Sequence, residues 1–328
     1  MVFTSDISRR RLYVGSSGHA LLARALRSDC TNFDLVHLHS VFLWPTWAAA
    51  RSARKTRIPY LISPRGMLVK DLIERRNRLV KSAWIKLIER KNLESASGIH
   101  VTSLLEREEL ERFGWQLPPI TTIPNGVDEI ENFAPDEIAT DVKELTVERP
   151  FILFFGRISW KKGLDRLLNA FACTHLGNLV IVGPDDEMLA PGLALRARDL
   201  QIANRVRFLT RTVVGADKEH LYRSATLFAL PSYSENFGNS VLEAMQRQLP
   251  VVVTPEVGAA EVVRESGGGL VVAGQPEPLC AAMSRLMADP GLARSLGEAG
   301  ARHVMAHYTW ARIADSMEGL YQRLSRRD

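Results

Sequence analysis

The chain has 328 residues, of which 46% are hydrophobic and 24% are charged, with 22 Gly and 16 Pro. These proportions are typical of a globular protein long enough for two domains, and they exclude a low-complexity or collagen-like chain. No apolar run reaches the roughly 18 residues that a membrane-spanning helix needs. The N-terminus has no apolar signal core, so the sequence predicts a cytoplasmic protein, with a location at the inner face of the plasma membrane as the open alternative.

The net charge of +5 is concentrated in the first part of the chain. Residues 1–130 hold 20 Lys and Arg against 13 Asp and Glu, whereas the remainder holds 22 against 24. This asymmetry indicates an anionic partner for the first half, and on charge alone anionic lipid, a lipid-phosphate acceptor and nucleic acid are all compatible. The three cysteines, Cys30, Cys173 and Cys280, are isolated, which argues against a disulfide framework or a Cys-based zinc site.

Apolar runs typical of buried strands alternate with helical patterns along most of the chain. In the first half the strands are predicted over 33–39, 60–63, 98–102 and 121–124. In the second half they are predicted over 151–155, 179–183, 206–209, 227–230, 251–254 and 269–272. Continuous apolar strands separated by helices predict an α/β protein with parallel sheets covered on both faces.

Helical patterns fill the intervals between these strands. They are predicted over 47–55, 69–94, 106–112, 163–173, 189–202, 218–224, 240–247, 256–265, 278–287 and 310–324. The alternation pauses over the acidic stretch 129–150, which predicts an interdomain connection with one short helix. We therefore predict an N-terminal domain over 1–130, a linker over 131–149, a C-terminal domain over 150–307, and a C-terminal helix over 308–328 that packs back toward the N-terminal domain.

The first segment with chemical potential follows the strand that ends at Phe155. Gly156 permits a tight turn, Arg157 and Lys162 lie on the turn, and a helix begins near Gly163. Two cations beside a helix N-terminus would neutralise a diphosphate. The segment is neither a GxGxxG nor a Walker A loop, and an ordinary solvated loop with surface cations would have the same composition.

The second segment, 234–243, follows the strand at 227–230, and two carboxylates bracket it. Glu235 leads the turn and Glu243 lies in the first turn of the next helix, where carboxylates can accept hydrogen bonds from paired sugar hydroxyls. Gly238 lets the backbone approach a phosphate. Two structural alternatives remain: Glu243 could close a capping box with Ser240, and Glu235 could be a surface turn residue.

Together these segments carry a family resemblance. Gly-Arg-x4-Lys-Gly, followed by Pro-Ser-x-x-Glu-x-Phe-Gly-x4-Glu-Ala-Met, resembles the donor domain of family-4 retaining glycosyltransferases. Those enzymes have the GT-B architecture, two Rossmann-like domains that face each other across a cleft. Segments 123–128, 250–254 and 261–263 resemble further parts of the family, and 34–40 with 63–68 resemble members that build bacterial surface polysaccharides.

The resemblance implies a role for each matching residue. Arg157 and Lys162 would hold the donor diphosphate and stabilise the leaving group, Glu235 would face the donor sugar, and these three form the expected catalytic set. Glu243 would bind the nucleotide ribose. The remaining donor-binding residues implied are Gly156, Asn236, Phe237, Gly238, Asn239, Gly183 and Arg211. The base would lie near 183–184 and 209–213, where Thr210 replaces the usual Gly and leaves the nucleotide open.

In the N-terminal half, the resemblance implies an acceptor side, for which His39 and Arg65 are the candidates. His39 lies at the carboxyl end of its strand, where α/β sheets bind ligands, although a half-buried histidine bonded to backbone is an alternative. His37 and His39 share one face of the strand, but no third ligand lies nearby in sequence. The sequence therefore predicts no metal and no cofactor other than the nucleotide-sugar substrate.

The segment 69–94 is basic and amphipathic. Such a helix can lie on an anionic membrane, and it can equally pack its apolar side in the core with solvated cations outside. The partners that the resemblance implies are a UDP-, GDP- or ADP-sugar donor and a saccharide or lipid-linked acceptor. No nucleic acid is expected as a partner.

The first 32 residues do not make a complete strand-helix-strand unit. The apolar run 2–4, the cluster 9–11 and a short helix over 19–26 precede the strand at 33–39. The resemblance implies a longer N-terminal segment with a Gly-rich acceptor-side loop, so we expect a domain truncated at its start and an activity that could be reduced.

The sequence thus predicts a glycosyltransferase that moves a sugar, with retention, from a nucleotide-sugar to an acceptor hydroxyl in polysaccharide, exopolysaccharide or lipopolysaccharide biosynthesis. Two alternatives stay open. One is a sugar-nucleotide epimerase of the same fold, which would need general acid and base residues. The other is a catalytically impaired nucleotide-sugar-binding protein.

Overall fold

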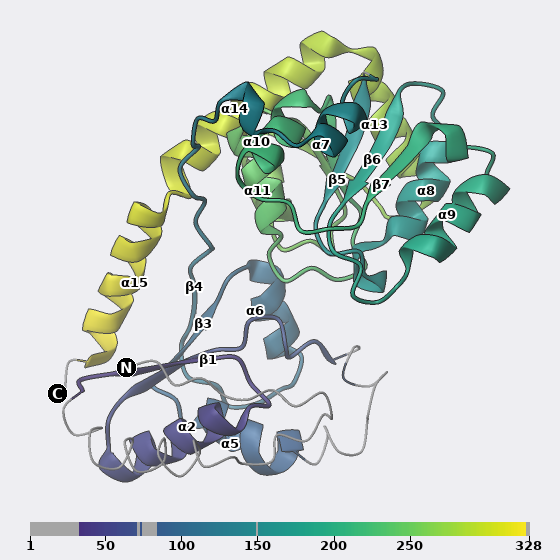
Figure 1. Cartoon of the computed structure of the whole chain (residues 1–328). Coiled ribbons are helices and arrows are strands. Elements are labelled where there is room, and N and C mark those ends of the chain that lie inside the picture. The colour runs from purple at the N-terminus through teal and green to yellow at the C-terminus, as the bar shows by residue number, and fades with distance from the viewer. Residues whose placement is uncertain (1–32, 71–72, 74–83, 149, 326–328) are drawn as a thin grey trace. The chain divides into compact units, whose positions relative to one another are not determined.

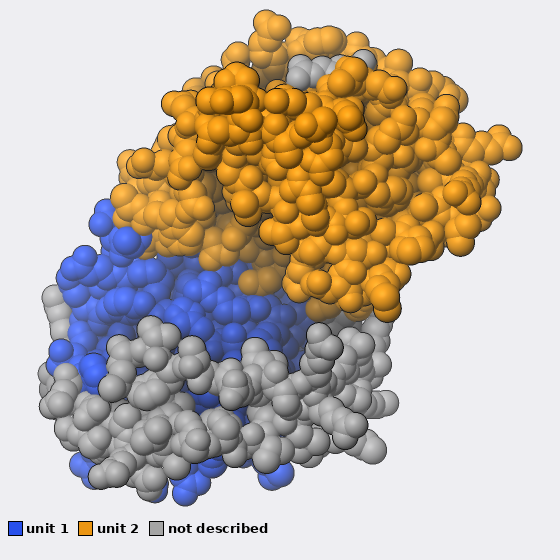
Figure 2. Space-filling view, viewed as in Figure 1, with its two compact units in different colours: residues 1–124, 314–328 blue, residues 125–313 orange. Residues whose placement is uncertain are grey.

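The computed structural model describes residues 33–70, 73, 84–148 and 150–325 (Figure 1). The features expected over 1–32, and residues 71–72 and 74–83 of the basic pattern at 69–94, lie outside these residues. The described chain forms two compact units (Figure 2). Unit 1 holds the described residues up to Pro124 together with those from Ala314 onward, and unit 2 runs from Asn125 to Ile313.

Unit 1 is built on a parallel four-stranded sheet of order β1-β2-β3-β4. The strands are β1 (Val36–His39), β2 (Tyr60–Ser63), β3 (Gly98–Val101) and β4 (Ile120–Thr122). The helices are α2 (Trp44–Thr56), a π-helical turn η2 (Ile85–Glu89), α5 (Arg90–Glu94) and α6 (Leu104–Glu111). β2 and β3 are buried along their whole length, because helices cover the apolar sheet.

Unit 2 contains a parallel six-stranded sheet of order β10-β9-β8-β5-β6-β7. The strands are β5 (Phe151–Phe155), β6 (Asn178–Val182), β7 (Val206–Leu209), β8 (Leu227–Leu230), β9 (Val251–Val253) and β10 (Gly269–Val271). The helices that connect them are α8 (Leu164–Ala172), α9 (Ala190–Asp199), α10 (Gly215–Ser224), α11 (Asn239–Gln246), α12 (Ala260–Ser266), α13 (Pro276–Ala288) and α14 (Pro290–His307). Fully buried Phe151, Phe154, Phe171 and Phe228 anchor the core between sheet and helices.

All ten predicted strands are confirmed, with ends that move by at most three residues. The acidic stretch after residue 129 carries a 3-10 turn, η3 (Pro135–Glu137), and one short helix, α7 (Thr140–Leu145), as expected. Its residues fall within unit 2. The last helix, α15 (Trp310–Ser325), is also confirmed, and its Leu324 packs over Gly98 of β3 inside unit 1.

One long helix, α14, was missed by the sequence analysis. Glycines inside a helical pattern weaken it, and α14 contains Gly297 and Gly300. Packing explains them: a Cβ on Gly297 would lie 1.9 Å from the carbonyl oxygen of Gln248, just beyond α11. Close approach of the two helices therefore requires glycine where local propensity disfavours it. Among the described residues, no helix is both long and apolar enough to cross a membrane.

Candidate functional site

The two ligand-binding segments follow neighbouring strands of the unit 2 sheet. β5 pairs with β8, so the loop after Phe155 and the loop after Leu230 leave the same edge of the sheet. The first loop includes a 3-10 turn, η4 (Trp160–Lys162), and leads into α8; the second leads into α11. The carboxyl edge of a parallel sheet is where α/β proteins bind their ligands.

The backbone binds these two loops together. The amide of Tyr233 donates to the carbonyl of Lys161 over 2.7 Å. Gly163 has a φ of +65°, and a Cβ there would lie 2.0 Å from the carbonyl oxygen of Pro231. Only glycine can occupy this position without moving one loop away from the other.

This contact places Lys162 beside Glu235, and their side chains form an ion pair. Both are largely shielded, with side-chain exposures of 16% and 18%. Arg157 is exposed, and its guanidinium has no hydrogen bond or ion pair with the other described residues. The positive charge of Lys162 is therefore balanced within the site, whereas that of Arg157 is available to an anion.

Glu235 is fixed by its backbone as well as by its side chain. Its amide donates to the carbonyl of Glu256 over 3.0 Å, and its carbonyl accepts from Gly258 over 2.9 Å. The amide of Ala259 donates to Phe237 over 2.7 Å, and the Phe237 side chain is buried in the core. The helix predicted from residue 256 begins at residue 260 because the preceding residues pair with this loop. Asn236 lies in the same paired stretch.

The helix after the loop settles one alternative. α11 begins at Asn239 with Gly238 as its N-cap, so the capping box between Ser240 and Glu243 is wrong. The Glu243 carboxylate instead accepts from the Tyr222 hydroxyl over 3.0 Å and from the Lys218 ammonium over 3.2 Å. Burial, followed by the charge of Glu243, raises the pKa of Tyr222 well above its ordinary value. Tyr222 therefore stays a hydrogen-bond donor that holds Glu243 in place.

Asn239 joins this site to the beginning of unit 2. Its Oδ1 accepts from the Asn125 side-chain amide over 2.9 Å. Farther along, the Asp128 carboxylate accepts from the Trp310 indole over 2.7 Å, and its carbonyl accepts from Gln246 over 2.9 Å. Each of these hydrogen bonds joins segments more than 100 residues apart in sequence, so no local sequence pattern predicted it.

The region predicted for the base lies at the ends of β5, β6 and β7. Gly156 donates to Val182 over 3.0 Å, and Gly183 donates to Leu209 over 3.0 Å. An open hollow of about 600 Å³ lies there, with Pro184, Phe208 and Thr210 among its lining residues. The hollow therefore lies beside residues for which the resemblance implies base binding, and that role stays a prediction.

Arg211 lies on the loop after β7, but its guanidinium is already engaged. It donates to Asp141 over 2.9 and 3.0 Å and to Asp217 over 3.1 Å. These hydrogen bonds raise the pKa of Arg211 and lower that of Asp141. The structure therefore gives Arg211 a role in joining α7 to α10, and a contact with a donor would compete with it.

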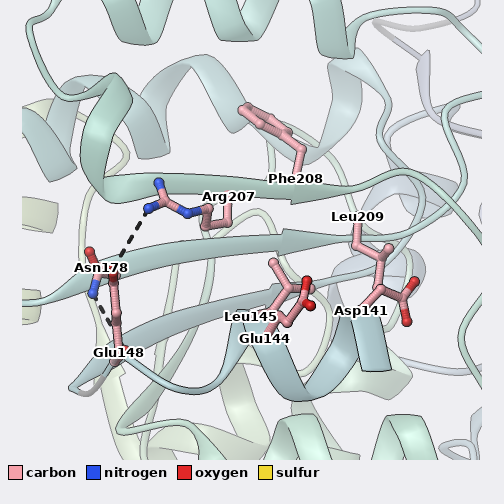
Figure 3. Close-up of a pocket in the computed structure, with 8 residues that line it drawn as sticks. All are labelled: Asp141, Glu144, Leu145, Glu148, Asn178, Arg207, Phe208 and Leu209. Atoms are coloured by element: carbon pink, nitrogen blue, oxygen red, sulfur yellow. Dashed lines mark hydrogen bonds and ion pairs between the residues drawn. The ribbon is translucent and has the colours of Figure 1, made fainter. Parts of the chain in front are cut away.

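A second cavity lies beside the edge strand β7 and has a volume of about 300 Å³ (Figure 3). Asp141, Glu144 and Glu148 contribute carboxylates from and just beyond α7, opposite Arg207 on β7. Leu209, from the region predicted for the base, also lines this cavity, whereas Arg157, Lys162, Glu235 and Glu243 do not.

In unit 1 the structure brings His39 and Arg65 together. Nη2 of Arg65 lies 3.3 Å from Nδ1 of His39, and both side chains follow neighbouring strands. The loop that carries Arg65 is held by the buried Glu106, whose carboxylate accepts from the Gly66 amide over 2.6 Å and from the Thr102 amide over 2.8 Å. Sequence reasoning missed Glu106, because a single glutamate in a charged helix carries no distinguishing signal.

His37, the neighbour of His39, is half-buried and hydrogen-bonded, but to side chains and not to backbone as the alternative for His39 expected. Both ring nitrogens of His37 are engaged, Nδ1 with Tyr321 and Nε2 with Ser63, each over 2.7 Å. Burial, with smaller contributions from His39, His100 and Arg65, lowers the pKa of His37 to about 3. His39 is exposed at the end of β1. The described residues contain no group of three His, Cys, Asp or Glu that could hold a metal ion.

Two parallel sheets in separate units, with a cationic loop at the carboxyl edge of the second, define an α/β protein of the GT-B type. Residues 136–303 match the family Glycosyl transferases group 1, and residues 8–126 match the Glycosyl transferase 4-like domain. The chain therefore belongs to the glycosyl transferases group 1.

Curated relatives agree with this assignment. Alpha-maltose-1-phosphate synthase of Mycolicibacterium smegmatis is 30% identical over 261 residues, which are 74% of this chain and 67% of that protein. D-inositol 3-phosphate glycosyltransferase of Acidothermus cellulolyticus is 30% identical over 266 residues, which are 77% of this chain and 54% of that protein. The chain thus spans about half to two thirds of the length of these relatives.

Solved structures share the fold. Sucrose-phosphate synthase from Thermosynechococcus elongatus superposes with a TM-score of 0.74 at 24% identity, over 97% of this chain and 80% of that chain. Anabaena Alr3699/HepE, solved in complex with UDP and glucose, gives a TM-score of 0.76 at 21% identity, over 94% of this chain and 84% of that chain.

Proposed function

We propose that this chain is a nucleotide-sugar-dependent glycosyltransferase in which unit 2 binds the donor and unit 1 the acceptor. The observation that carries the proposal is the cluster of Arg157, Lys162 and Glu235 at one sheet edge of a chain that belongs to the glycosyl transferases group 1. The complex of the structural relative HepE with UDP and glucose supports a nucleotide-sugar as the donor.

In this proposal the donor diphosphate replaces Glu235 as the partner of Lys162. The diphosphate oxygens would bind Arg157 directly and draw Lys162 away from Glu235. Glu235, once released, would accept hydrogen bonds from the hydroxyls of the donor sugar, and the backbone of 236–239 would line sugar and phosphate. Glu243 would use its remaining lone pairs for the ribose hydroxyls.

The reaction would break the bond between the sugar anomeric carbon and the diphosphate oxygen, and would form a bond from that carbon to an acceptor hydroxyl oxygen. The acceptor oxygen would attack from the face that the diphosphate leaves, so that configuration is retained. The hydroxyl proton would pass to the departing diphosphate, so that no protein base is required. Positioning and electrostatic stabilisation of the leaving group would supply the catalysis.

The acceptor would be a hydroxyl of a growing surface polysaccharide, exopolysaccharide or lipopolysaccharide, or of a lipid-linked saccharide. The basic character of residues 1–130 favours an acceptor or a membrane surface that carries negative charge. The middle of the amphipathic pattern at 69–94, residues 71–72 and 74–83, lies outside the described residues, so membrane contact stays a prediction.

The test is a turnover assay of the full chain with UDP-, GDP- and ADP-glucose, with and without a mixture of saccharide acceptors. We expect release of the nucleoside diphosphate together with sugar on the acceptor. An altered free nucleotide-sugar, with no diphosphate released, would instead identify an epimerase. A thermal shift with a donor but no product in any combination would identify a binding protein.

A further inference from the structure

A chain of hydrogen bonds crosses the unit 1 sheet from α15 to the end of β4. Tyr321 contacts His37 over 2.7 Å, His37 contacts Ser63 over 2.7 Å, and Ser63 contacts His100 over 2.8 Å. Nε2 of His100 then contacts the carbonyl of Ile123 over 2.8 Å. We call these five residues the histidine ladder.

The chemistry of the groups fixes the direction of every bond in the ladder when both histidines are neutral. A carbonyl only accepts, so Nε2 of His100 carries the proton and Nδ1 accepts from the Ser63 hydroxyl. Ser63 must then accept from Nε2 of His37, and Nδ1 of His37 accepts from the Tyr321 hydroxyl. Protonation of either ring would place a hydrogen where the ladder needs a lone pair.

His39 follows the same rule at the open end of β1. Arg65 donates from Nε and Nη2 to Nδ1 of His39, over 3.4 and 3.3 Å, and a guanidinium cannot accept in return. Nδ1 therefore holds a lone pair, and the proton of the neutral ring lies on Nε2. No described residue hydrogen-bonds that Nε2, and the His39 side chain is exposed.

The neighbours of His39 oppose a positive charge on its ring. The His37 ring lies at 4.1 Å between centroids, and Arg65 is a fixed cation. Burial first, and then Arg65 and His100, lower the pKa of His39 below its ordinary value. The titratable groups around His39 and the neighbouring His37 are Arg65 and His100, which lower the pKa of both rings, and Tyr321, which contacts His37. From the adjacent α2, the Thr46 hydroxyl donates to the His39 carbonyl over 3.4 Å.

We infer that His39 acts as a neutral hydrogen-bond donor, through Nε2–H, to an oxygen atom of the acceptor-side ligand, and that it is not a base for the acceptor hydroxyl. Arg65 is a positioning residue that fixes the tautomer, and the histidine ladder keeps the adjacent His37 ring neutral and in place. The ligand's contact atom is therefore a hydrogen-bond acceptor, such as a phosphate, carbonyl or ether oxygen. The ligand role rests on the proposed function, whereas the tautomer does not.

The direct test is nuclear magnetic resonance of the full chain labelled with 15N in histidine, using long-range proton–nitrogen correlations to read both ring nitrogens of His39. A His39→Gln variant assigns the signals. We expect an unprotonated Nδ1 and a protonated Nε2 at pH 7.5, with a titration midpoint below 6.5. In Arg65→Met the midpoint should rise toward the ordinary value and the tautomers should mix.

The matched control is Arg107→Met, which removes an exposed arginine paired with Glu111 on α6 of the same unit. It should leave the His39 signals unchanged. A proton on Nδ1 of His39, or a midpoint at or above 6.5, would overturn the inference whether or not the chain transfers sugar.

Kinetics give a second readout. His39→Gln keeps an N–H near the position of Nε2, so transfer should fall by no more than about tenfold, as for one altered neutral hydrogen bond. Loss of a general base would cost on the order of 100- to 10,000-fold. A loss of that size in His39→Gln, in protein with an unchanged melting temperature, would also overturn the inference, even though the glycosyltransferase proposal would stand.

Discussion

At the scale of single residues, most charged groups of the proposed donor site already have partners, and Arg157 is the exception among the described residues. Lys162 is balanced by Glu235, and Glu243 is held by Lys218 and Tyr222. Such pairing holds both carboxylates in place before a ligand arrives, which lowers the entropic cost of binding. It also means that a substitution changes structure and binding together, so the two must be separated by experiment.

Glu243 offers that separation. Glu243→Ala should weaken donor binding and also lower the free energy of unfolding by about 1–3 kcal/mol, because the buried Tyr222 hydroxyl loses its carboxylate partner. The double variant with Tyr222→Phe should recover most of that stability, since no buried hydroxyl remains, while donor binding stays weak. Urea unfolding and calorimetric titration with UDP, GDP and ADP measure the two effects. If the double variant recovered donor binding, Glu243 would support only the fold and would not bind the donor.

At the scale of elements, the sequence predicted the strands better than the helices. Continuous apolar runs bounded by Gly and Pro predicted both sheets, because parallel strands are buried on both faces. The sequence did not predict α14, because its glycines serve helix packing. The start of α12 was predicted too early, because residues 256–259 pair with the Glu235 loop. Both errors arise from tertiary contacts that override local preference.

The same distinction holds for the site. Arg157, Lys162, Glu235 and Glu243 could be predicted because they sit in an ordered motif next to strand ends. Their supporting partners could not, because each is a single residue contributed by a distant segment, such as Tyr222 to Glu243 or Tyr321 to His37. A hydrogen-bond partner that has no fixed spacing from the site residue leaves no recognisable pattern in the sequence.

The histidine ladder makes the stability of the unit 1 sheet depend on pH. The pKa of His37 is about 3 in the folded chain, against an ordinary value of 6.5, so the unfolded chain binds more protons between these values. The stability that the neutral ring contributes is complete above pH 6.5 and is lost as the pH falls toward 3. For each such histidine, the free energy of unfolding changes by at most about 1.4 kcal/mol per pH unit.

Urea unfolding at pH 7.5, 6.0 and 5.0 measures this dependence. The His37→Gln variant should show a shallower loss of stability than the unchanged chain. His175→Gln, at an exposed position after α8, serves as the control and should follow the unchanged chain. Equal pH dependence in all three proteins would contradict the account of the ladder.

At the scale of the whole molecule, net charge does not explain how a donor would be bound. Residues 125–313, which make up unit 2, carry 19 Lys and Arg against 23 Asp and Glu, so the unit proposed to bind the donor has no overall attraction for an anion. Attraction for a diphosphate must therefore come from local groups, which are Arg157, Lys162 and the helix N-termini at the carboxyl edge of the sheet. The proposed function depends on that local arrangement.

The most direct measurement is the affinity of UDP, GDP and ADP for the Arg157→Met variant, determined by calorimetric titration beside the unchanged chain. The control is Arg207→Met. Arg207 is an exposed arginine of the same unit, and it lines the second cavity, which lies beside β7. We predict that the preferred nucleotide binds Arg157→Met about 10- to 150-fold more weakly, as for a lost charge-assisted hydrogen bond, and binds the control normally. Unchanged affinity in Arg157→Met, or an equal loss in both variants, would contradict the assignment of the donor site.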